Sequence, residues 1–164
     1  MAAHVRQRLA PQVDRLMINA NQNLPAYAAI CDEVWPDVLD GFAGPLAGLQ
    51  SGLLRCQTPY LVSVPCDSPF LPLDLVGRLQ HALLQQDADL AVAVTGPAEQ
   101  RQPQPVFSLM KTAVLPHLSA FLQSGGRKFD AWYATLKVAE VAFSDENAFR
   151  NINTLDDLHK FEAS

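Results

Sequence analysis

Two aspartates each follow a short apolar run and stand beside prolines. Asp67 lies in the sequence VPCDSPFLP, directly after residues 60–64, an apolar and β-branched run typical of a buried strand. Ligands of open α/β sheets bind outside the carboxyl ends of the strands, so a carboxylate there is placed to hold a divalent metal ion. Asp37 repeats this arrangement after residues 33–36. Plainer explanations stay open, because Asp67 can simply shape the turn and Asp37 can be a solvated loop acid.

Amide and basic side chains form a second set of candidates. Asn19 and Asn21 end a strand-like segment over residues 15–21. Asparagine at such a position either makes a turn or binds a base or ribose with its donor and acceptor atoms. Arg127 and Lys128 follow two glycines. This basic turn either holds a phosphate group or is a solvated helix end, where cations are favourable.

Three glycines recur at every fourth residue in a segment that is predicted to be helical. Gly44, Gly48 and Gly52 fall on one stripe of this helix, and Pro45 fits its first turn. A stripe without side chains lets the helix lie close to a sheet, or lets a ligand approach the backbone. The first amides of such a helix are also suited to an anion.

The rest of the chain alternates between apolar strand-like runs and amphipathic helical segments, which favours a three-layer α/β sandwich with a mostly parallel sheet. The histidines, including His117, are expected to be surface or core residues. Thr154 is the expected N-cap of the last helix, with Asp157 three residues later. The predicted helices are residues 2–12, 24–30, the glycine-striped segment with Pro45 in its first turn, 74–86, 111–124, a segment holding Trp132 and Tyr133, and one that begins at Thr154. The predicted strands are 15–21, 33–37, 60–64, 89–95, 105–110 and 138–143; residues 96–104 are predicted as a loop and 147–153 as a turn.

Composition narrows the class of protein. The chain has 164 residues, which predicts one domain over residues 1–164. A net charge of −5 offers no basic surface for nucleic acid, and no apolar run approaches the length of a membrane span. Three cysteines without a CxxC pair argue against a disulfide framework or a cysteine zinc site. We therefore expect a cytoplasmic protein.

Four sequence blocks together resemble those of molybdenum cofactor guanylyltransferases. The blocks are VRQRLAPQVDRLMINANQN, FAGPLAGL, VPCDSPFLP and FRNINTLDDL, in the order and spacing of that family along nearly the whole chain. The related cytidylyltransferases carry a Gly-Asp-Met-Pro-like block where this chain has PCDSP, which favours the guanine enzyme. Sugar-nucleotide pyrophosphorylases share the fold but lack support from the PCDSP and NINT blocks.

The resemblance implies an activity, a metal and a set of site residues. The family transfers GMP from magnesium-bound GTP to molybdopterin-bound molybdenum, releasing pyrophosphate, on a Rossmann-like nucleotidyltransferase fold. Molybdoenzymes or their chaperones are the expected protein partners. By this resemblance Asp67 binds Mg²⁺ and is the catalytic residue; Asn19, Asp37 and Asp67 contact GTP; and Asn151, Asn153, Arg127 and Lys128 lie near molybdopterin.

The chain departs from the family pattern at its start. The family has a first strand and a glycine-rich loop of the form LAGGxxxRMGxDK, which cradles the triphosphate, whereas this sequence begins at the helix after that loop. About 30 residues, most of a βα unit, are then missing, which predicts an N-terminally truncated domain with exposed flanks on the neighbouring strands. We expect little guanylyltransferase activity from such a chain. The alternative to the enzyme is a truncated, non-catalytic remnant that binds a nucleotide or molybdopterin, or that assembles with partners.

Overall fold

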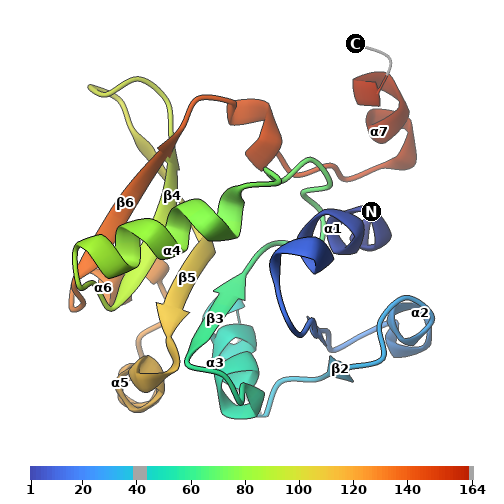
Figure 1. The fold of residues 1–164 in the computed structure, drawn as a ribbon. Coiled ribbons are helices and arrows are strands. Elements are labelled where there is room, and N and C mark those ends of the chain that lie inside the picture. Colours follow the sequence, from blue (N-terminus) through green and yellow to red (C-terminus); the bar gives the residue numbers. More distant parts are fainter. Residues whose placement is uncertain (39–43, 163–164) are drawn as a thin grey trace.

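A four-stranded sheet lies between two layers of helices in the computed structural model, which describes residues 1–38 and 44–162 (Figure 1). The strand order is β3-β5-β4-β6, and a separate two-stranded parallel sheet pairs β1 with β2. Strands β3, β4 and β6 share one direction, and β5 runs against both of its neighbours. The predicted three-layer sandwich is therefore confirmed. The elements are α1 (Ala2–Leu9), η1 (Ala10–Gln12), β1 (Ile18–Asn19), α2 (Leu24–Ala28), β2 (Val34–Trp35), α3 (Pro45–Arg55), β3 (Tyr60–Ser63), α4 (Leu75–Gln85), β4 (Leu90–Thr95), β5 (Gln102–Lys111), η2 (Thr112–Val114), α5 (Leu115–Gln123), α6 (Phe129–Tyr133), β6 (Val138–Phe143), η3 (Glu146–Phe149) and α7 (Leu155–Glu162).

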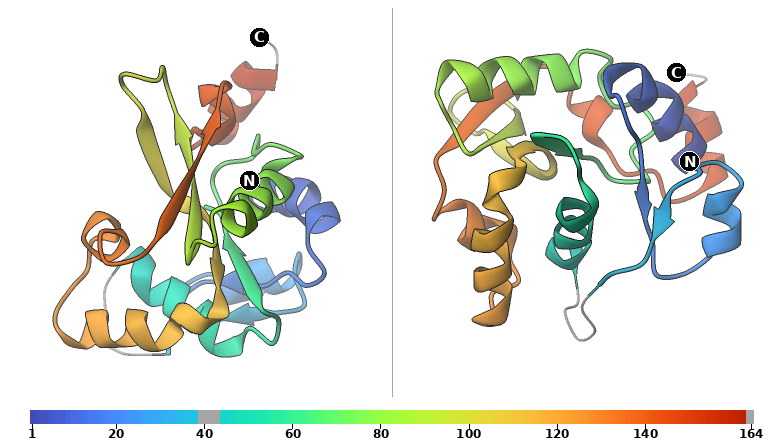
Figure 2. Two further views of the ribbon diagram at one scale, coloured as in Figure 1. Left: turned by 60° about the vertical axis from the view of Figure 1, so that its left-hand side comes forward. Right: turned by 60° about the horizontal axis from the view of Figure 1, so that its bottom comes forward.

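Strand β4 shows why the sheet needs a helical layer on each face. All six of its residues are buried, and alternate side chains enter opposite cores. Ala91 and Ala93 belong to the core that α1 and α4 cover, whereas Leu90 and Val92 belong to the core that α3, α5 and α6 cover. Figure 2 shows α4 and α5 on the two sides of the sheet. Helix α4 presents three fully buried leucines at four-residue spacing, and burying each contributes about 1.5–3 kcal/mol. They are Leu75, Leu79 and Leu83.

His117 accepts a hydrogen bond from a buried residue of the core that α5 and α6 help to form. The indole Nε1–H of Trp132, a fully buried residue, donates to His117 Nδ1 at 3.0 Å. Because an unpaired buried donor is costly, we expect His117→Ala to lower the free energy of unfolding by about 1–3 kcal/mol. Equilibrium urea unfolding followed by tryptophan fluorescence measures this change. His81→Ala, at an exposed position of α4, is the control, and an equal effect of both variants would contradict the assignment.

Strand β5 begins earlier than the sequence predicted. Residues 96–104 were expected to form a loop, but β5 starts at Gln102 and includes Pro103 and Pro105. Strand β3 pairs only with residues 108–111 of β5, so the prolines lie beyond β3, where one edge of β5 has no partner strand among the described residues. Proline lacks a backbone N–H and is tolerated at such an edge. The register in which β4 pairs with β5 shifts between Val92 and Ala93 of β4.

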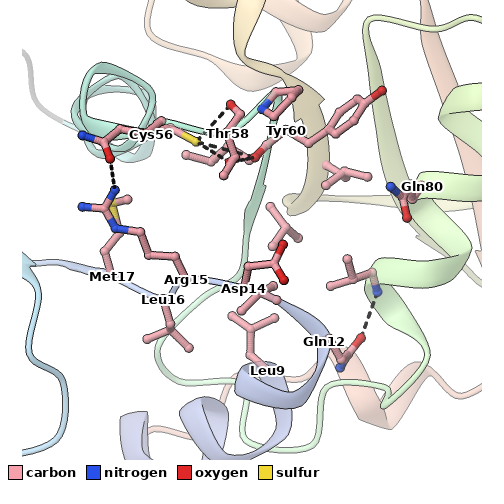
Figure 3. A pocket seen from close by; sticks show the side chains of 17 residues that line it. Leu9, Gln12, Asp14, Arg15, Leu16, Met17, Cys56, Thr58, Tyr60 and Gln80 are labelled. Atoms are coloured by element: carbon pink, nitrogen blue, oxygen red, sulfur yellow. Dashed lines mark hydrogen bonds between the residues drawn. The ribbon is translucent and has the colours of Figure 1, made fainter.

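The two sheets face each other with unpaired edges. The backbone amides of Ile18 and Ala20 donate to carbonyl groups of the β2 segment. The residues that alternate with them, Met17 and Asn19, therefore direct their backbone groups away from β2. Strand β3 pairs with β5 and with no second strand in the described part of the chain. A cavity of about 320 Å³ lies between β3, α4 and residues 12–17 (Figure 3). Strands β1 and β3 thus each have one edge without a partner strand in the described part of the chain.

Some expectations fall beyond the part of the chain that the structure describes. Residues 42–43, which open the FAGPLAGL segment, lie outside the described residues. Thr154, by contrast, caps α7 as expected, because its Oγ1 accepts from the Asp157 amide at 3.1 Å. Within the described residues, every helix is too short or too polar to cross a bilayer.

Candidate active site

A cavity of about 350 Å³ brings several of the predicted residues to one place. It lies between the β1–β2 sheet, the start of α3, and the carboxyl end of β3. This position, outside the carboxyl end of a strand, is where open α/β sheets bind ligands. Its described lining includes Asn19, Asn21, Trp35, Asp37, Gly44, Pro45, Gly48, Cys66, Val106 and Phe129.

Asp37 and two asparagines form a hydrogen-bonded cluster at this cavity. Asn19 Nδ2 donates to Asp37 Oδ1 at 3.0 Å, and Asn21 Nδ2 donates to Asp37 Oδ2 at 2.9 Å. The Asp37 amide in turn donates to Asn21 Oδ1 at 2.9 Å. The parallel pairing of β1 with β2 brings the two segments together, so Asn19 and Asp37 meet although 18 residues separate them. Two amide donors hold the carboxylate in a fixed orientation.

Gly48 makes room for this cluster. A β-carbon at Gly48 would lie 2.4 Å from Asn19 Oδ1 and 3.8 Å from Asp37 Oδ1. Gly52, one turn later, would meet Leu61 Cδ1 at 3.3 Å, so it lets α3 approach the sheet. Of the two predicted tasks, close packing of the helix on the sheet is seen at Gly52, whereas the group that approaches the backbone at Gly48 is the carboxamide of Asn19.

Asp67 lies in a turn beyond β3 that the C-terminal part of the chain covers. Its neighbour Cys66 lines the cavity. The Ile152 amide donates to the Asp67 carbonyl at 2.7 Å, and Ser68 Oγ donates to Asn151 Oδ1 at 3.0 Å. The structure thus joins Asp67 to the predicted Asn151 segment.

The predicted basic residues lie in the turn between α5 and α6. Arg127 donates to the carbonyls of Leu122 at 3.0 Å and Gly126 at 2.6 Å, so it caps the end of α5. Lys128 is exposed and is the N-cap residue of α6. The next residue, Phe129, lines the cavity. This turn therefore adjoins the cavity. Asn153, the remaining predicted residue, lies in a different segment and is exposed.

The surroundings of Cys66 disfavour ionisation of its thiol. Desolvation, with a smaller contribution from the Asp67 charge, raises the pKa of this thiol above its ordinary value. We expect Asp67→Asn to remove a negative neighbour, lower the Cys66 pKa and speed alkylation by iodoacetamide at pH 8 several-fold, because the thiolate is the nucleophile. Alkylation is followed in chains where Cys31 and Cys56 are serines. Equal rates with and without the Asp67 carboxylate would contradict this.

The donor set fits a metal ion that arrives with a nucleotide. Among the described residues, no three histidine, cysteine or acidic side chains are placed to hold a metal together. Mg²⁺ commonly binds through one or two carboxylates together with substrate phosphates and water. One carboxylate at Asp67 is consistent with that arrangement, and Asp37 is the one charged residue in the described cavity lining.

Comparison with known proteins identifies the family. A family model described as a MobA-like NTP transferase domain matches residues 1–138. The chain belongs to this family. A relative from Bordetella petrii, named molybdenum cofactor guanylyltransferase, is 58% identical over 98% of this chain and 82% of its own length. A relative of the same name from Cupriavidus taiwanensis is 53% identical over 99% of this chain and 82% of its own length.

Solved structures show the same fold. Molybdopterin-guanine dinucleotide biosynthesis protein A from Archaeoglobus fulgidus superposes with a TM-score of 0.72 at 20% identity, over 98% of this chain and 82% of that one. The 2-C-methyl-D-erythritol 4-phosphate cytidylyltransferase from Thermus thermophilus gives 0.71 at 17% identity, over 98% and 85%. The resemblance found in the sequence is thus confirmed as membership of the MobA-like family, with a nucleotidyltransferase fold.

Two further residues are joined to the predicted site residues. Asn21, a candidate in the sequence to which the family resemblance gave no role, hydrogen-bonds Asp37 through both its side-chain nitrogen and its side-chain oxygen. Ser68 gave no signal, because its partner Asn151 is 83 residues away. A serine between Asp67 and a proline is unremarkable in sequence, so only the folded chain reveals this contact.

Proposed function

We propose that this protein transfers GMP from GTP to molybdopterin-bound molybdenum, forming the guanine dinucleotide cofactor. A terminal phosphate oxygen of molybdopterin forms a bond to the α-phosphorus of GTP, and the bond from that phosphorus to the β-phosphate oxygen breaks, releasing pyrophosphate. The observation that carries the proposal is 58% identity, over 98% of the chain, to a relative named for this activity. The cavity supports it through the fixed Asn19–Asp37 pair.

Asn19 and Asp37 are proposed to hold GTP. Both line the cavity, and their hydrogen bond and those of Asn21 fix both side chains before any ligand arrives. Fixed polar groups bind a nucleotide with little loss of side-chain entropy. The described lining contains no lysine or arginine, so we expect triphosphate binding to depend strongly on a divalent cation.

Asp67 is proposed to hold Mg²⁺ together with the GTP phosphates. Bound there, the ion would supply positive charge to offset the negative charge that develops around the α-phosphate. The protein's own contribution is to position two anions against each other, because phosphoryl and nucleotidyl transfers need little covalent help from side chains. The attacking phosphate is already an anion at neutral pH, so the proposal needs no general base.

The acceptor is proposed to bind beside the part of the cavity that Phe129 and Cys66 line, because Phe129 follows the basic turn and Cys66 adjoins the Asp67 turn that Asn151 contacts. Asn151 and Asn153 offer amide groups, and Lys128 and Arg127 offer positive charge, to the phosphate of molybdopterin. Three free cysteines fit a reducing compartment, which supports a cytoplasmic location. Molybdoenzymes or their chaperones are the protein partners that would receive the product.

Calorimetric titration with GTP tests the proposal. Wild-type protein is titrated with and without Mg²⁺, and Asp67→Ala is titrated under the same conditions. We expect micromolar binding that requires Mg²⁺ and that Asp67→Ala weakens at least about 10-fold, because a lost charge-assisted contact costs 1.5–3 kcal/mol. CTP is the control nucleotide. Tighter binding of CTP, or GTP binding unaffected by Asp67→Ala, would contradict the proposal.

A further inference from the structure

Ser68 occupies an unusual place for a polar residue. It has no exposed surface, and it directly follows the proposed metal ligand Asp67. Its hydroxyl donates to Asn151 Oδ1 at 3.0 Å, a contact between residues 83 positions apart. A fully buried hydroxyl has to be paired, so this contact fixes where Asn151 lies relative to the Asp67 turn.

A second hydrogen bond lies next to the first. The Ile152 amide donates to the carbonyl of Asp67 at 2.7 Å, and Ile152 is itself buried. Residues 67–68 and 151–152 are therefore joined by two bonds, one through a side chain and one through the backbone. We call this pair of hydrogen bonds the latch.

The C-terminal side of the latch is firmly anchored. Phe149 is buried. The centroid of its ring lies 4.8 Å from that of Phe107, in an edge-to-face arrangement, and 5.1 Å from that of Phe143. The latch thus ties the Asp67 turn to a segment that the core already holds. The far end of the turn is held separately, because Leu71 is fully buried and its carbonyl accepts from Arg8 Nε at 2.7 Å.

Because Ser68 is the donor in the latch, it determines which atom of the Asn151 carboxamide remains available to a ligand. Ser68 donates to the carboxamide oxygen, so the amide nitrogen of Asn151 points away from the serine. Among the described residues that nitrogen has no hydrogen-bond partner. An amide N–H suits a phosphate oxygen, which accepts only.

We infer that Ser68 is a positioning residue: through the latch it holds the Asp67 carboxylate and the acceptor-binding amide of Asn151 in one fixed arrangement. The inference rests on the proposed role of Asp67 in binding the metal ion. It adds to that role a physical coupling between the metal side of the site and the acceptor side. Neither Ser68 nor the latch touches a reacting atom.

Manganese binding in the presence of GTP tests the inference, with free Mn²⁺ measured by electron paramagnetic resonance on the full chain. Ser68→Ala and Asn151→Leu each remove the side-chain bond of the latch. We expect each to weaken Mn²⁺ binding about 3- to 10-fold, and the double variant to be no weaker than either, because all three lack the same bond.

Two further variants separate positioning from a general loss of stability. Asn151→Asp keeps an acceptor for Ser68, so it should bind Mn²⁺ as tightly as wild type or more tightly. Ser119→Ala removes another serine contact, the one from Gln50 Nε2 at 3.0 Å, and should leave Mn²⁺ binding unchanged. Hydrogen exchange at the Ile152 amide should become faster in Ser68→Ala and in Asn151→Leu, and should stay at the wild-type rate in Asn151→Asp and Ser119→Ala.

The outcomes distinguish the inference from the proposed function. Wild-type protein without GTP-dependent Mn²⁺ binding would refute the role of Asp67, and the inference with it. Wild-type binding together with an unchanged Ser68→Ala affinity, or with additive effects of Ser68→Ala and Asn151→Leu, would refute the inference alone.

Discussion

Gly48→Ala is expected to weaken GTP binding about 10- to 100-fold while the protein stays folded. The added β-carbon would lie 2.4 Å from Asn19 Oδ1, so the Asn19 side chain has to rotate away. That rotation breaks its 3.0 Å hydrogen bond to Asp37 and leaves the carboxylate with fewer donors. Folding should not suffer, because alanine stabilises a helix interior by about 1 kcal/mol relative to glycine. Calorimetry with GTP and Mg²⁺, together with urea unfolding, measures both effects.

Gly77→Ala is the matched control for this experiment. It makes the same chemical change inside α4, where a β-carbon would meet nothing within 4 Å. We expect it to raise the free energy of unfolding slightly and to leave GTP affinity unchanged. If Gly48→Ala bound GTP as tightly as Gly77→Ala does, the Asn19–Asp37 pair would not belong to the nucleotide site.

Phe149→Ala is expected to cost about 3–5 kcal/mol of unfolding free energy. Its ring is buried between those of Phe107 and Phe143, and truncation leaves a cavity that such a packed core closes only in part. Because whole domains are stable by only about 5–15 kcal/mol, this is a large share of the total. Equilibrium urea unfolding at constant protein concentration gives the change.

Leu84→Ala supplies the comparison for Phe149. Leu84 is 56% exposed on α4, so its truncation should change stability by less than about 0.5 kcal/mol. Similar losses in the two variants would show that Phe149 does not anchor the C-terminal segment. The proposed attachment of Asn151 would then need another source of rigidity.

Much of the fold follows from local sequence patterns. The four-residue spacing of leucines predicted α4, and the apolar β-branched runs predicted β3, β4 and β6. Strand β1 is shorter than residues 15–21 because β2 is its one partner strand in the described structure, and a short ladder orders few residues. The direction of β5 and its start at Gln102 depend on which of its residues pair with β3 and which with β4. The local sequence of β5 does not specify these pairings.

Residue types in the sequence were enough to predict several members of the candidate site, but not which of them contact each other. Acids and amides at strand ends pointed to Asn19, Asp37 and Asp67. That Asn19 and Asp37 touch, and that Asn21 holds the other carboxylate oxygen, depends on the β1–β2 pairing. The link from Ser68 to Asn151 depends on a return of the chain across the sheet, which side-chain chemistry alone does not specify.

The gap between the two sheets has a mechanical consequence. Asn19 and Asp37 stand on the β1–β2 sheet and Asp67 follows β3, and no backbone ladder joins these sheets in the described residues. A side-chain link, from Arg15 Nη1 to Gln57 Oε1 at 3.3 Å, spans them instead. We therefore expect the distance between the two sheets to vary more than distances within either sheet, and a bound nucleotide to reduce that variation. The amides of Ile18 and Ala20 should exchange faster than those of β4 in the free protein, and slow down once GTP bridges the two sheets.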